Sequence, residues 1–568
     1  EVVLFLPYYH KIKTNAAYMV ERVAEIRVQL GWRQQYCGIM KLTNRNDGVQ
    51  VYFLDNDYYF GARTGAIYGD MDDGERFAFF SRGCLDAMIA LNFIPEIIQC
   101  NDWQTACIPI YLKAMYHGAF YKTRCMYTIH NIEYQGWANA GFFDDVLGLP
   151  WEYRSTLDMS NSVNVMKGAI ETADLVTTVS ETYARELMYP YYAHGLDSVL
   201  AGNAWKLTGI TNGIDVNTFN PETDPALPAH YNSETFVEGK AAVKAALQKE
   251  VGLPVKPDVP LMVMVTRLAG HKGLDLLCYI ARRLIWEEDA QLLILGTGEA
   301  QYESFFRDLS NQFPDQVSAQ ITFNLGLAAR IYAGGDIYLM PSKSEPCGLS
   351  QMNAMRYGTV PIVHETGGLK DSVRAYKDFD GIGDGFAFSD YQAKDLYLAI
   401  SEAVKLYFGD EAMFDRLRVR CMKKDFSWDK SAERYNRMYE DICGGAGAGE
   451  PIPFEEAFDQ LRHCYMENER TNRVRHESGY QRVVQITIIG RGAGTFTIRF
   501  NENGMQVEPT SASDAEAYVH CSFDNLLAMA RGFVTVDKLY LSGQLRLSGN
   551  LSKGFEIRYL LSPAKQRA

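Results

Sequence analysis

Residues 260–299, PLMVMVTRLAGHKGLDLLCYIARRLIWEEDAQLLILGTGE, place an amphipathic stretch between two short apolar runs. The runs within 260–268 and 291–299 have the length and turn-bounded composition of buried strands, and 273–287 has helical periodicity. Strand, helix and strand in this order predict a parallel βαβ unit, because parallel strands need a crossover connection of this length.

The same rhythm extends in both directions along the chain. Before it, EIIQCND (96–102), TACIPIYLKAMYHG (105–118) and RCMYTIHN (124–131) again predict strand, helix and strand. After it, strands are expected at ITFNLG (321–326), DIYLMPS (336–342) and TVPIVHE (359–365), and SWDKSAERYNRMYEDIC (427–443) predicts a closing amphipathic helix. The predicted fold class is therefore α/β, with two Rossmann-like, doubly wound domains.

Beyond that helix the composition changes. GGAGAGEPIP (444–453) predicts a flexible linker, and strand candidates then cluster at RVVQITIIG, GTFTIRFNENG, DKLYLSGQLRLSGN and FEIRYLL. Helices are expected at EEAFDQLRHCYMENE and SFDNLLAMARG, so the last region is a small α+β domain. The predicted domains are 1–210, 211–442 and 454–568, with a linker at 443–453.

The composition limits the partners. A chain of 568 residues is longer than one hydrophobic core usually organises, and at about 100–200 residues per domain it should form several domains. A formal net charge of −14 argues against a nucleic acid as partner, because like charges repel. The 11 cysteines include no C-x-x-C pair and sit mostly among apolar residues, which indicates reduced thiols in the cytoplasm. We see no apolar run near the roughly 18–20 residues of a membrane span, and no secretory signal.

The stretch 336–358, DIYLMPSKSEPCGLSQMNAMRYG, contains the sharpest candidate site. A strand should end at Pro341 and a helix should begin after Pro346. Backbone amides at such a helix start favour a phosphate, and Glu345 at the mouth of the cleft would bind a sugar hydroxyl. The amides belong to Cys347, Gly348, Leu349 and Ser350. The alternative is an ordinary capped turn with a surface glutamate.

Other candidates also follow predicted strands. Arg267 and Lys272 can neutralise a diphosphate leaving group, although a solvated basic pair is the simpler interpretation. Further polar side chains at predicted strand ends, or between the two halves of the chain, are His130, Asn131, Asp102 and Asn212. A lone histidine is more often structural than catalytic.

Taken together, the motifs of residues 1–442 closely resemble those of bacterial and plant glycogen/starch synthases. The motifs, in the family's order, are LGWRQQYCGI, YGDMDDGERFAFFSRG, CNDWQTACIPIYLK, TIHNIEYQG, TVSETYARELM, GITNGIDVNTFNPETD, TRLAGHKGLDLL and SEPCGLSQMNAMRYGTVPIVHETGGLKDSV. The resemblance implies a retaining glycosyltransferase of the two-Rossmann (GT-B) class. Its active site would lie in the interdomain cleft and need no metal or cofactor. It would transfer glucose from ADP-glucose to the non-reducing end of an α-1,4-glucan; the sequence leaves UDP-glucose open as donor.

The resemblance also assigns roles by position. Arg267 and Lys272 would hold the diphosphate, and Glu345 with the amides of the SEPCGL turn would hold donor sugar and phosphate. His130, Asp102 and Asn212 would line the glucose pocket. Asn131 is carried over as a donor-binding residue, Tyr68 would lie beside the donor, and Phe323 takes the position of a tyrosine that stacks on adenine.

The mechanism by which the anomeric configuration is retained stays open: it could be a covalent intermediate or a front-face attack. A second glutamate, found in related transferases eight positions after the first, is here Asn353. This does not support a two-glutamate scheme, and the resemblance suggests front-face attack with the His130 carbonyl stabilising the sugar cation. GDMDDG (69–74) imitates an acidic metal motif, but it precedes a helix in a different architecture.

Two departures from the family lead to further expectations. EVVLFLPYY matches the family's second strand, so we expect an N-terminally incomplete chain that lacks a central strand and a Lys-x-Gly-Gly loop, and is poorly expressed or inactive. Residues 500–550 are similar to sterol-carrier-protein-like domains, which implies an apolar tunnel for a lipid-like ligand; a packed domain without a ligand is the alternative. Two other classes of protein compete with this interpretation: a phosphorylase, and a non-catalytic scaffold that binds glucan or lipid.

Overall fold

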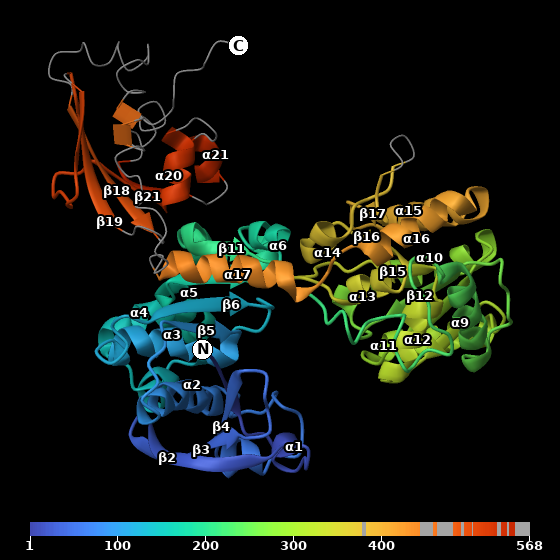
Figure 1. Cartoon of the computed structure of the whole chain (residues 1–568), viewed down its shortest axis with the longest axis horizontal. Helices are drawn as coiled ribbons and strands as arrows, with labels where there is room; N and C mark the ends of the chain where they lie inside the picture. Colours follow the sequence, from blue (N-terminus) through green and yellow to red (C-terminus); the bar gives the residue numbers. More distant parts are fainter. Residues whose placement is uncertain are drawn as a thin grey trace. The chain divides into compact units, whose positions relative to one another are not determined.

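A computed structural model of the chain shows two compact units (Figure 1). The structure describes residues 1–377, 382–443, 458–459, 461–462, 481–489, 494–502, 504–530, 536–541 and 545–550. Unit 1 comprises residues 1–177, 187–208 and the described residues from 436 onward; unit 2 comprises 178–186 and the described residues of 209–435. The predicted linker at 444–453 lies outside the described residues.

Unit 2 is built on a parallel sheet of order β14-β13-β12-β15-β16-β17. Its strands are β12 Leu261–Val265, β13 Gln291–Leu295, β14 Val317–Gln320, β15 Ile337–Met340, β16 Val360–His364 and β17 Phe386–Phe388. The βαβ unit predicted from 260–299 is confirmed, with β12 and β13 in parallel register from Leu261↔Gln291 to Val265↔Leu295. The strand expected at ITFNLG (321–326) is wrong: β14 ends at Gln320, residues 321–324 form the connection, and Leu325 and Gly326 open helix α12.

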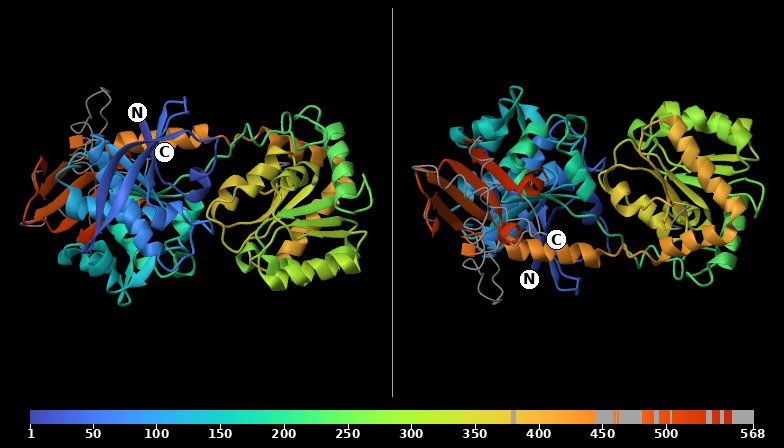
Figure 2. Two further views of the ribbon diagram at one scale, coloured as in Figure 1. Left: turned by 90° about the horizontal axis from the view of Figure 1, so that it is seen from below. Right: turned by 90° about the horizontal axis from the view of Figure 1, so that it is seen from above.

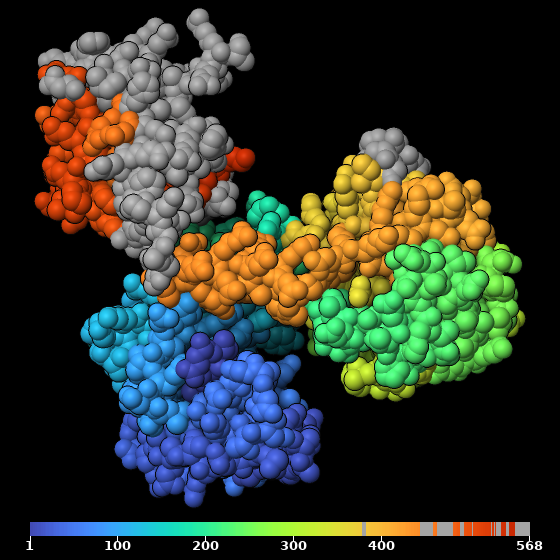
Figure 3. All heavy atoms as spheres, viewed as in Figure 1, coloured from blue at the N-terminus to red at the C-terminus, as the bar shows by residue number. Residues whose placement is uncertain are grey.

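Helices cover both faces of this sheet (Figure 2). The helices of unit 2 are α6 Glu181–Glu186, α9 Phe236–Glu250, α10 Leu274–Glu287, α11 Ala300–Gln312, α12 Leu325–Gly334, α13 Ser350–Arg356, α14 Gly367–Ser372, α15 Ala393–Gly409, α16 Glu411–Lys423 and the first half of α17 Trp428–Ile442. Because neighbouring strand residues point to opposite faces, Met262 and Met264 pack with α10, α11 and α15, whereas Leu261 and Val263 pack with α9, α12 and α13. Figure 3 shows the resulting close-packed body in green to orange.

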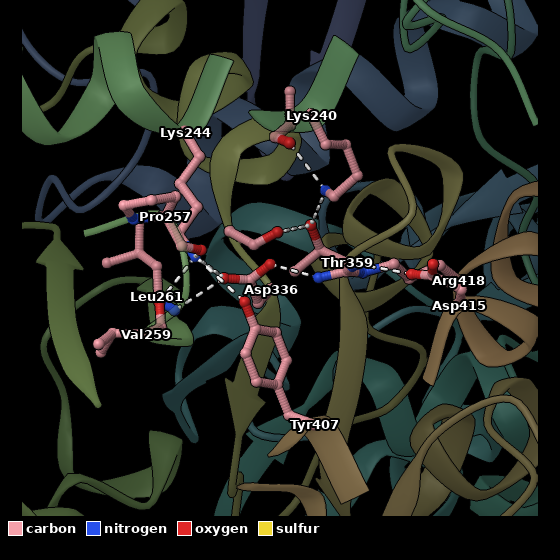
Figure 4. A network of polar contacts seen from close by, with 12 residues as sticks. Lys240, Lys244, Pro257, Val259, Leu261, Asp336, Thr359, Tyr407, Asp415 and Arg418 are labelled. Atoms are coloured by element: carbon pink, nitrogen blue, oxygen red, sulfur yellow. Dashed lines mark hydrogen bonds and ion pairs between the residues drawn. The ribbon is translucent and has the colours of Figure 1, made fainter. Parts of the chain in front are cut away.

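A buried ion network ties the core of unit 2 together (Figure 4). The Asp336 carboxylate, placed directly before β15, contacts Lys244 of α9 at 2.7 Å and Arg418 of α16 at 2.5 Å. It also accepts a hydrogen bond from the Leu261 amide of β12 at 2.9 Å. Burial alone would raise the pKa of Asp336, but the two cations outweigh it and the pKa is lowered. One carboxylate thus links a sheet strand to helices on both of its faces.

The short segment 178–186 is held in unit 2 by a reciprocal pair of helix caps. Asp371, at the end of α14, accepts from the Ser180 hydroxyl at 2.6 Å and the Thr182 amide at 3.0 Å, which caps α6. Glu186, at the end of α6, accepts from the Gly367 amide at 3.0 Å and so caps α14. Each carboxylate satisfies a helix N-terminus that would otherwise leave its first amides without partners.

The N-terminal region of unit 1 contains two four-stranded sheets, of order β1-β4-β3-β2 and β11-β10-β6-β5, where we expected one continuous doubly wound sheet. Its strands are β1 Val2–Pro7, β2 Val20–Leu30, β3 Arg33–Leu42, β4 Val49–Asp55, β5 Ile97–Asn101, β6 Arg124–Ile129, β10 Leu175–Thr178 and β11 Leu207–Gly209, with a small sheet of β7 Trp137–Asn139, β9 Ser162–Asn164 and β8 Asp158–Met159. The first sheet is mixed: β1 pairs with β4 in parallel, and β2, β3 and β4 form an antiparallel meander. The predicted β5–helix–β6 unit is confirmed, with β5 and β6 parallel.

The helices of this region are short apart from α2. They are α1 His10–Lys13, α2 Asp73–Ala90, α3 Cys107–Tyr111, α4 Arg154–Leu157, α5 Val165–Thr172, α7 Pro190–Ala193 and α8 Asp197–Gly202. No helix among the described residues combines the length and the apolar character needed to cross a bilayer.

The C-terminal region forms a five-stranded mixed sheet of order β20-β19-β18-β21-β22. Its elements are β18 Gln481–Ile489, β19 Gly494–Asn501, β20 Gly504–Glu508, β21 Ala517–Ser522, α20 Phe523–Ala530, α21 Val536–Leu541 and β22 Leu545–Gly549. The expected helix within SFDNLLAMARG is confirmed as α20. DKLYL was expected to be a strand and is part of helix α21; Val536 and Leu539 pack into the core, which is helical spacing. FEIRYLL and most of EEAFDQLRHCYMENE lie outside the described residues.

Candidate active site

Unit 2 contains a cavity of about 290 Å³ at the carboxyl ends of β12 and β15. This is the edge at which a doubly wound sheet binds its ligands. The residues lining the cavity are Met264, Val265, Thr266, Arg267, Lys272, Tyr338, Leu339, Met340, Ser342, Glu345, Leu349 and Ser350. The structure therefore brings together five residues expected from the sequence: Arg267, Lys272, Glu345, Leu349 and Ser350.

An ion pair dominates the polar part of this cavity. The Lys272 ammonium lies 2.7 Å from Glu345 Oε2, and the Ser342 hydroxyl donates to the same oxygen at 2.9 Å. Glu345 is only 8% exposed and lines the cavity, which argues against the alternative of a surface glutamate in an ordinary capped turn. Arg267 is exposed, and its Nη2 lies 3.2 Å from His271 Nε2.

The SEPCGL turn differs from its predicted form. Helix α13 begins at Ser350 with Leu349 as its N-cap, so Cys347 and Gly348 precede the helix instead of opening it. Gly348 has φ +70°, a left-handed conformation, and a Cβ there would come within 2.5 Å of Gln351 Oε1. Cys347 is buried, which raises the pKa of its thiol to about 12 against the opposing effect of the Asn212 backbone. Asn212 thus lies beside the turn.

A second group of predicted residues lies in unit 1, where β5 and β6 end. Asp102 adopts φ +56°, which is uncommon for a residue other than glycine. Its Oδ1 accepts from the His130 amide at 2.8 Å and from the Asn131 amide at 3.4 Å. The His130 ring lies 2.9 Å from Asn101 Oδ1. Burial raises the pKa of Asp102, and the adjacent His130 and the two amides partly offset it.

The two aromatic candidates lie elsewhere in the structure. Phe323 is 81% exposed in the connection between β14 and α12, outside the lining of the cavity. Tyr68 is exposed and precedes α2 in unit 1. Both rings are accessible for stacking.

The GDMDDG motif brings three carboxylates together within 4.8 Å. Arg63 contacts Asp70 at 3.0 Å and also pairs with Asp72, and Arg76 contacts Asp73 at 2.7 Å. The hydrogen bond from Arg63 lowers the pKa of Asp72 despite burial. The carboxylates neutralise two guanidinium groups at the start of α2, which is a structural use of the motif.

Two neighbours of the predicted residues were missed in the sequence. Ser342 and Asn101 hold Glu345 and His130, but serine and asparagine at strand ends are too common to be singled out. Only the hydrogen bonds that they form identify them.

Comparison with known proteins gives a consistent result. Residues 1–202 match the model of the starch synthase catalytic domain, 248–418 that of glycosyl transferases group 1, and 458–562 that of the SCP-2 sterol transfer family. Among similar proteins, glycogen synthase of Exiguobacterium sibiricum is 45% identical over 452 residues, 78% of this chain and 92% of that protein. Glycogen synthase of Geobacillus stearothermophilus is 43% identical over 443 residues, 77% of this chain and 90% of that protein.

A solved structure supports the same assignment. The catalytic domain of starch synthase IV from Arabidopsis thaliana, bound to ADP and acarbose, is 33% identical and has a TM-score of 0.70. The match covers 77% of this chain and 90% of that chain.

The two α/β regions and these matches define a glycosyltransferase of GT-B architecture. Within that class, the chain belongs to the glycogen synthase family and carries a C-terminal SCP-2 domain. The recognition made from the sequence motifs is thereby confirmed, as are the fold class and the enzyme class.

Proposed function

We propose that the protein transfers glucose from ADP-glucose to the non-reducing end of an α-1,4-glucan with retention of the anomeric configuration. The observation that carries the proposal is the cavity of unit 2, in which Lys272, Glu345 and Ser350 meet at the carboxyl ends of two parallel strands. Glycogen synthases that share over 40% of this sequence, and a similar starch synthase that binds ADP and acarbose, support the choice of donor and acceptor.

In this proposal unit 2 holds the donor. Arg267 and Lys272 stabilise the diphosphate, whose negative charge grows as the glycosidic bond to phosphate breaks. An ammonium has three donors, so Lys272 can keep its bond to Glu345 and still bind a phosphate oxygen. Both bonds to Glu345 end on Oε2, which leaves Oε1 as the proposed acceptor for a glucose hydroxyl.

The remaining donor contacts come from the residues around the SEPCGL turn. The amides of Gly348 and Leu349 and the Ser350 hydroxyl contribute to the phosphate site, with Cys347 and Asn212 shaping the turn. Phe323 stacks on adenine, because its ring is freely accessible and every nucleobase offers a π-face.

The residues of unit 1 act on the reacting sugar. The backbone around His130 is fixed by Asp102, so the His130 carbonyl can face a developing sugar cation without reorganising. Asp102 is accordingly a positioning residue, and Asn131 and Tyr68 contact the donor. The residue eight positions after Glu345 is Asn353, so we propose front-face attack assisted by the leaving phosphate, with the acceptor hydroxyl giving its proton to that phosphate.

The test is transfer of labelled glucose from ADP-glucose to glycogen by the full chain. Lys272→Ala and Glu345→Ala should each lower kcat by about 10²-fold, since preorganised charge acts on the transition state. Lys249→Ala, an exposed cation at the end of α9, is the matched control and should leave kcat unchanged. Near-normal rates in both site variants would refute the assignment of the donor site, and UDP-glucose in parallel tests the choice of nucleotide.

The C-terminal domain carries a second proposed activity. We propose the division 1–210, 211–442 and 454–568 into domains, and the match to the SCP-2 family supports a lipid-like ligand for the last one. A chain that ends at residue 453 should retain glucosyl transfer and lose binding of a fluorescent fatty acyl probe. Unchanged probe binding after truncation would contradict this. The unpaired thiols of the described cysteines fit the cytoplasm as the proposed compartment.

A further inference from the structure

Helix α10 presents two large aromatic side chains to solvent. Tyr279 is 84% exposed and Trp286 is 72% exposed. They are seven residues apart, which in an α-helix places both on the same face at a separation of about 10 Å along the axis. Arg282 lies between them on that face and is also exposed.

The neighbouring helix α11 completes this surface. The Trp286 ring contacts Phe313 edge-on with centroids 6.4 Å apart, and the Arg282 guanidinium lies 5.7 Å from the centroid of Phe305. Arg282 Nη2 also donates to Gln312 Oε1 at 3.2 Å. We call Tyr279, Arg282, Trp286, Phe305 and Phe313 the α10 platform. Its two exposed aromatic rings are flanked by groups that donate and accept hydrogen bonds.

The fold does not require aromatic residues on this face. The opposite face of α10 already packs Leu277, Ile280 and Leu284 into the core. Tyr279 and Trp286 add little to that packing and keep most of their apolar surface in water, which is unfavourable. A cluster of exposed aromatic residues of this kind marks a binding surface.

The charges beside the platform select the kind of ligand. Arg282 and Arg283 stand beside Asp275 and Glu287 on the same helix and beside Glu288 and Asp289 directly after it, and Arg283 pairs with Glu287 at 2.9 Å. A surface without net positive charge offers no attraction to a nucleic acid or to an anionic membrane. It fits an uncharged ligand that has apolar faces and polar edges.

We propose that the α10 platform binds a chain of the α-glucan acceptor outside the catalytic cavity. Each pyranose ring has a face of C–H groups that can stack on Tyr279 or Trp286, and an edge of hydroxyls that can reach Arg282 and Gln312. None of the platform residues lines the 290 Å³ cavity, so the platform retains the polymer and takes no part in chemistry. The inference rests on the proposed function for the identity of the polymer.

The experiment measures glycogen binding and transfer with the full chain. Affinity electrophoresis in gels with increasing glycogen gives a dissociation constant, and transfer assays use either glycogen or maltotetraose as acceptor. The test variant is Tyr279→Ala/Trp286→Ala. Its controls are Tyr279→Phe/Trp286→Phe, which keeps an aromatic ring at each position, and Trp151→Ala, which removes a 72% exposed tryptophan from unit 1.

The alanine pair should weaken glycogen binding by about 10-fold or more, since two stacking contacts are lost. Its KM for glycogen should rise while kcat with maltotetraose and the thermal midpoint stay unchanged, and the phenylalanine pair and Trp151→Ala should behave like the parent chain. Glycogen binding that is equal in all variants would overturn the inference. So would a change of oligomeric mass at unchanged glycogen binding, which would identify the face as a contact between copies.

The two proposals fail in different ways. If the parent chain shows no glucosyl transfer and the alanine pair still binds glycogen more weakly than the parent, the proposed function is refuted and the platform is supported. A parent chain that transfers glucose normally, with equal glycogen affinity in every variant, would refute only the platform.

Discussion

Replacing Asp336 by asparagine tests how much of the stability of unit 2 depends on the buried ion network (Figure 4). The substitution keeps the shape of the side chain and an acceptor for the Leu261 amide. It removes the negative charge of the Asp336 carboxylate, which lies 2.7 Å from Lys244 and 2.5 Å from Arg418. Removing one partner of a buried ion pair costs about 3–5 kcal/mol, because the remaining charge stays buried without compensation.

The structure places the expected cost near the lower end of that range. Lys244 still donates to the carbonyls of Pro257 at 3.0 Å and Val259 at 2.7 Å, and Arg418 still contacts Asp415 at 2.8 Å. We therefore expect a loss of about 3 kcal/mol in the free energy of unfolding of unit 2. For a unit of this size the thermal midpoint should fall by roughly 6–12 °C.

The assay combines thermal melting with hydrogen exchange of peptides from β12 and β15. Asp415→Asn is the control, because the Asp415 side chain is 25% exposed against 5% for Asp336, so water screens its ion pair more and its loss should cost less. The folded-state pKa of Asp336 lies below its unfolded value of about 3.9, so its contribution is present above that pH and is lost as the pH falls through the folded pKa. A cost below about 1 kcal/mol for Asp336→Asn, or an equal cost for Asp415→Asn, would refute the reasoning.

Three further perturbations follow from single contacts. Gly348→Ala should destabilise unit 2 by about 1–3 kcal/mol and weaken ADP binding, measured by melting and calorimetry, because φ is +70° and a Cβ would approach Gln351 within 2.5 Å. Burial lowers the pKa of Lys206 to about 8, so between pH 8 and 10.5 the unfolded chain binds one more proton than the folded chain, and stability increases with pH. Lys206→Met removes this titration and should flatten the rise of the unit 1 melting midpoint over that pH range. Asp371→Ala removes the cap of α6 and should cost about 1–2 kcal/mol, which would appear as faster hydrogen exchange confined to residues 180–186.

Much of the candidate site could be predicted because its residues directly follow strands. Asp102 and His130 each come one position after β5 and β6 end in the sheet of unit 1, and Arg267 comes two positions after β12 ends in the sheet of unit 2. Within each sheet, the parallel order of the strands collects such positions at one edge. The boundaries were less predictable where a turn had no strong signal. The start of α13 was expected too early, since Gly348 adopts a left-handed turn before Leu349 caps the helix.

The sequence alone was sufficient for the fold class, the βαβ units and the family, because hydrophobic periodicity and ordered motifs are local properties of the chain. It predicted several of the residues that line the cavity of unit 2, but not their burial or their pairing. Only the tertiary structure showed that Glu345 is buried against Lys272 and Ser342, that Asp102 holds the His130 backbone, and that Tyr279 and Trp286 share an exposed face. Burial and pairing depend on residues distant in sequence, so no local pattern specifies them.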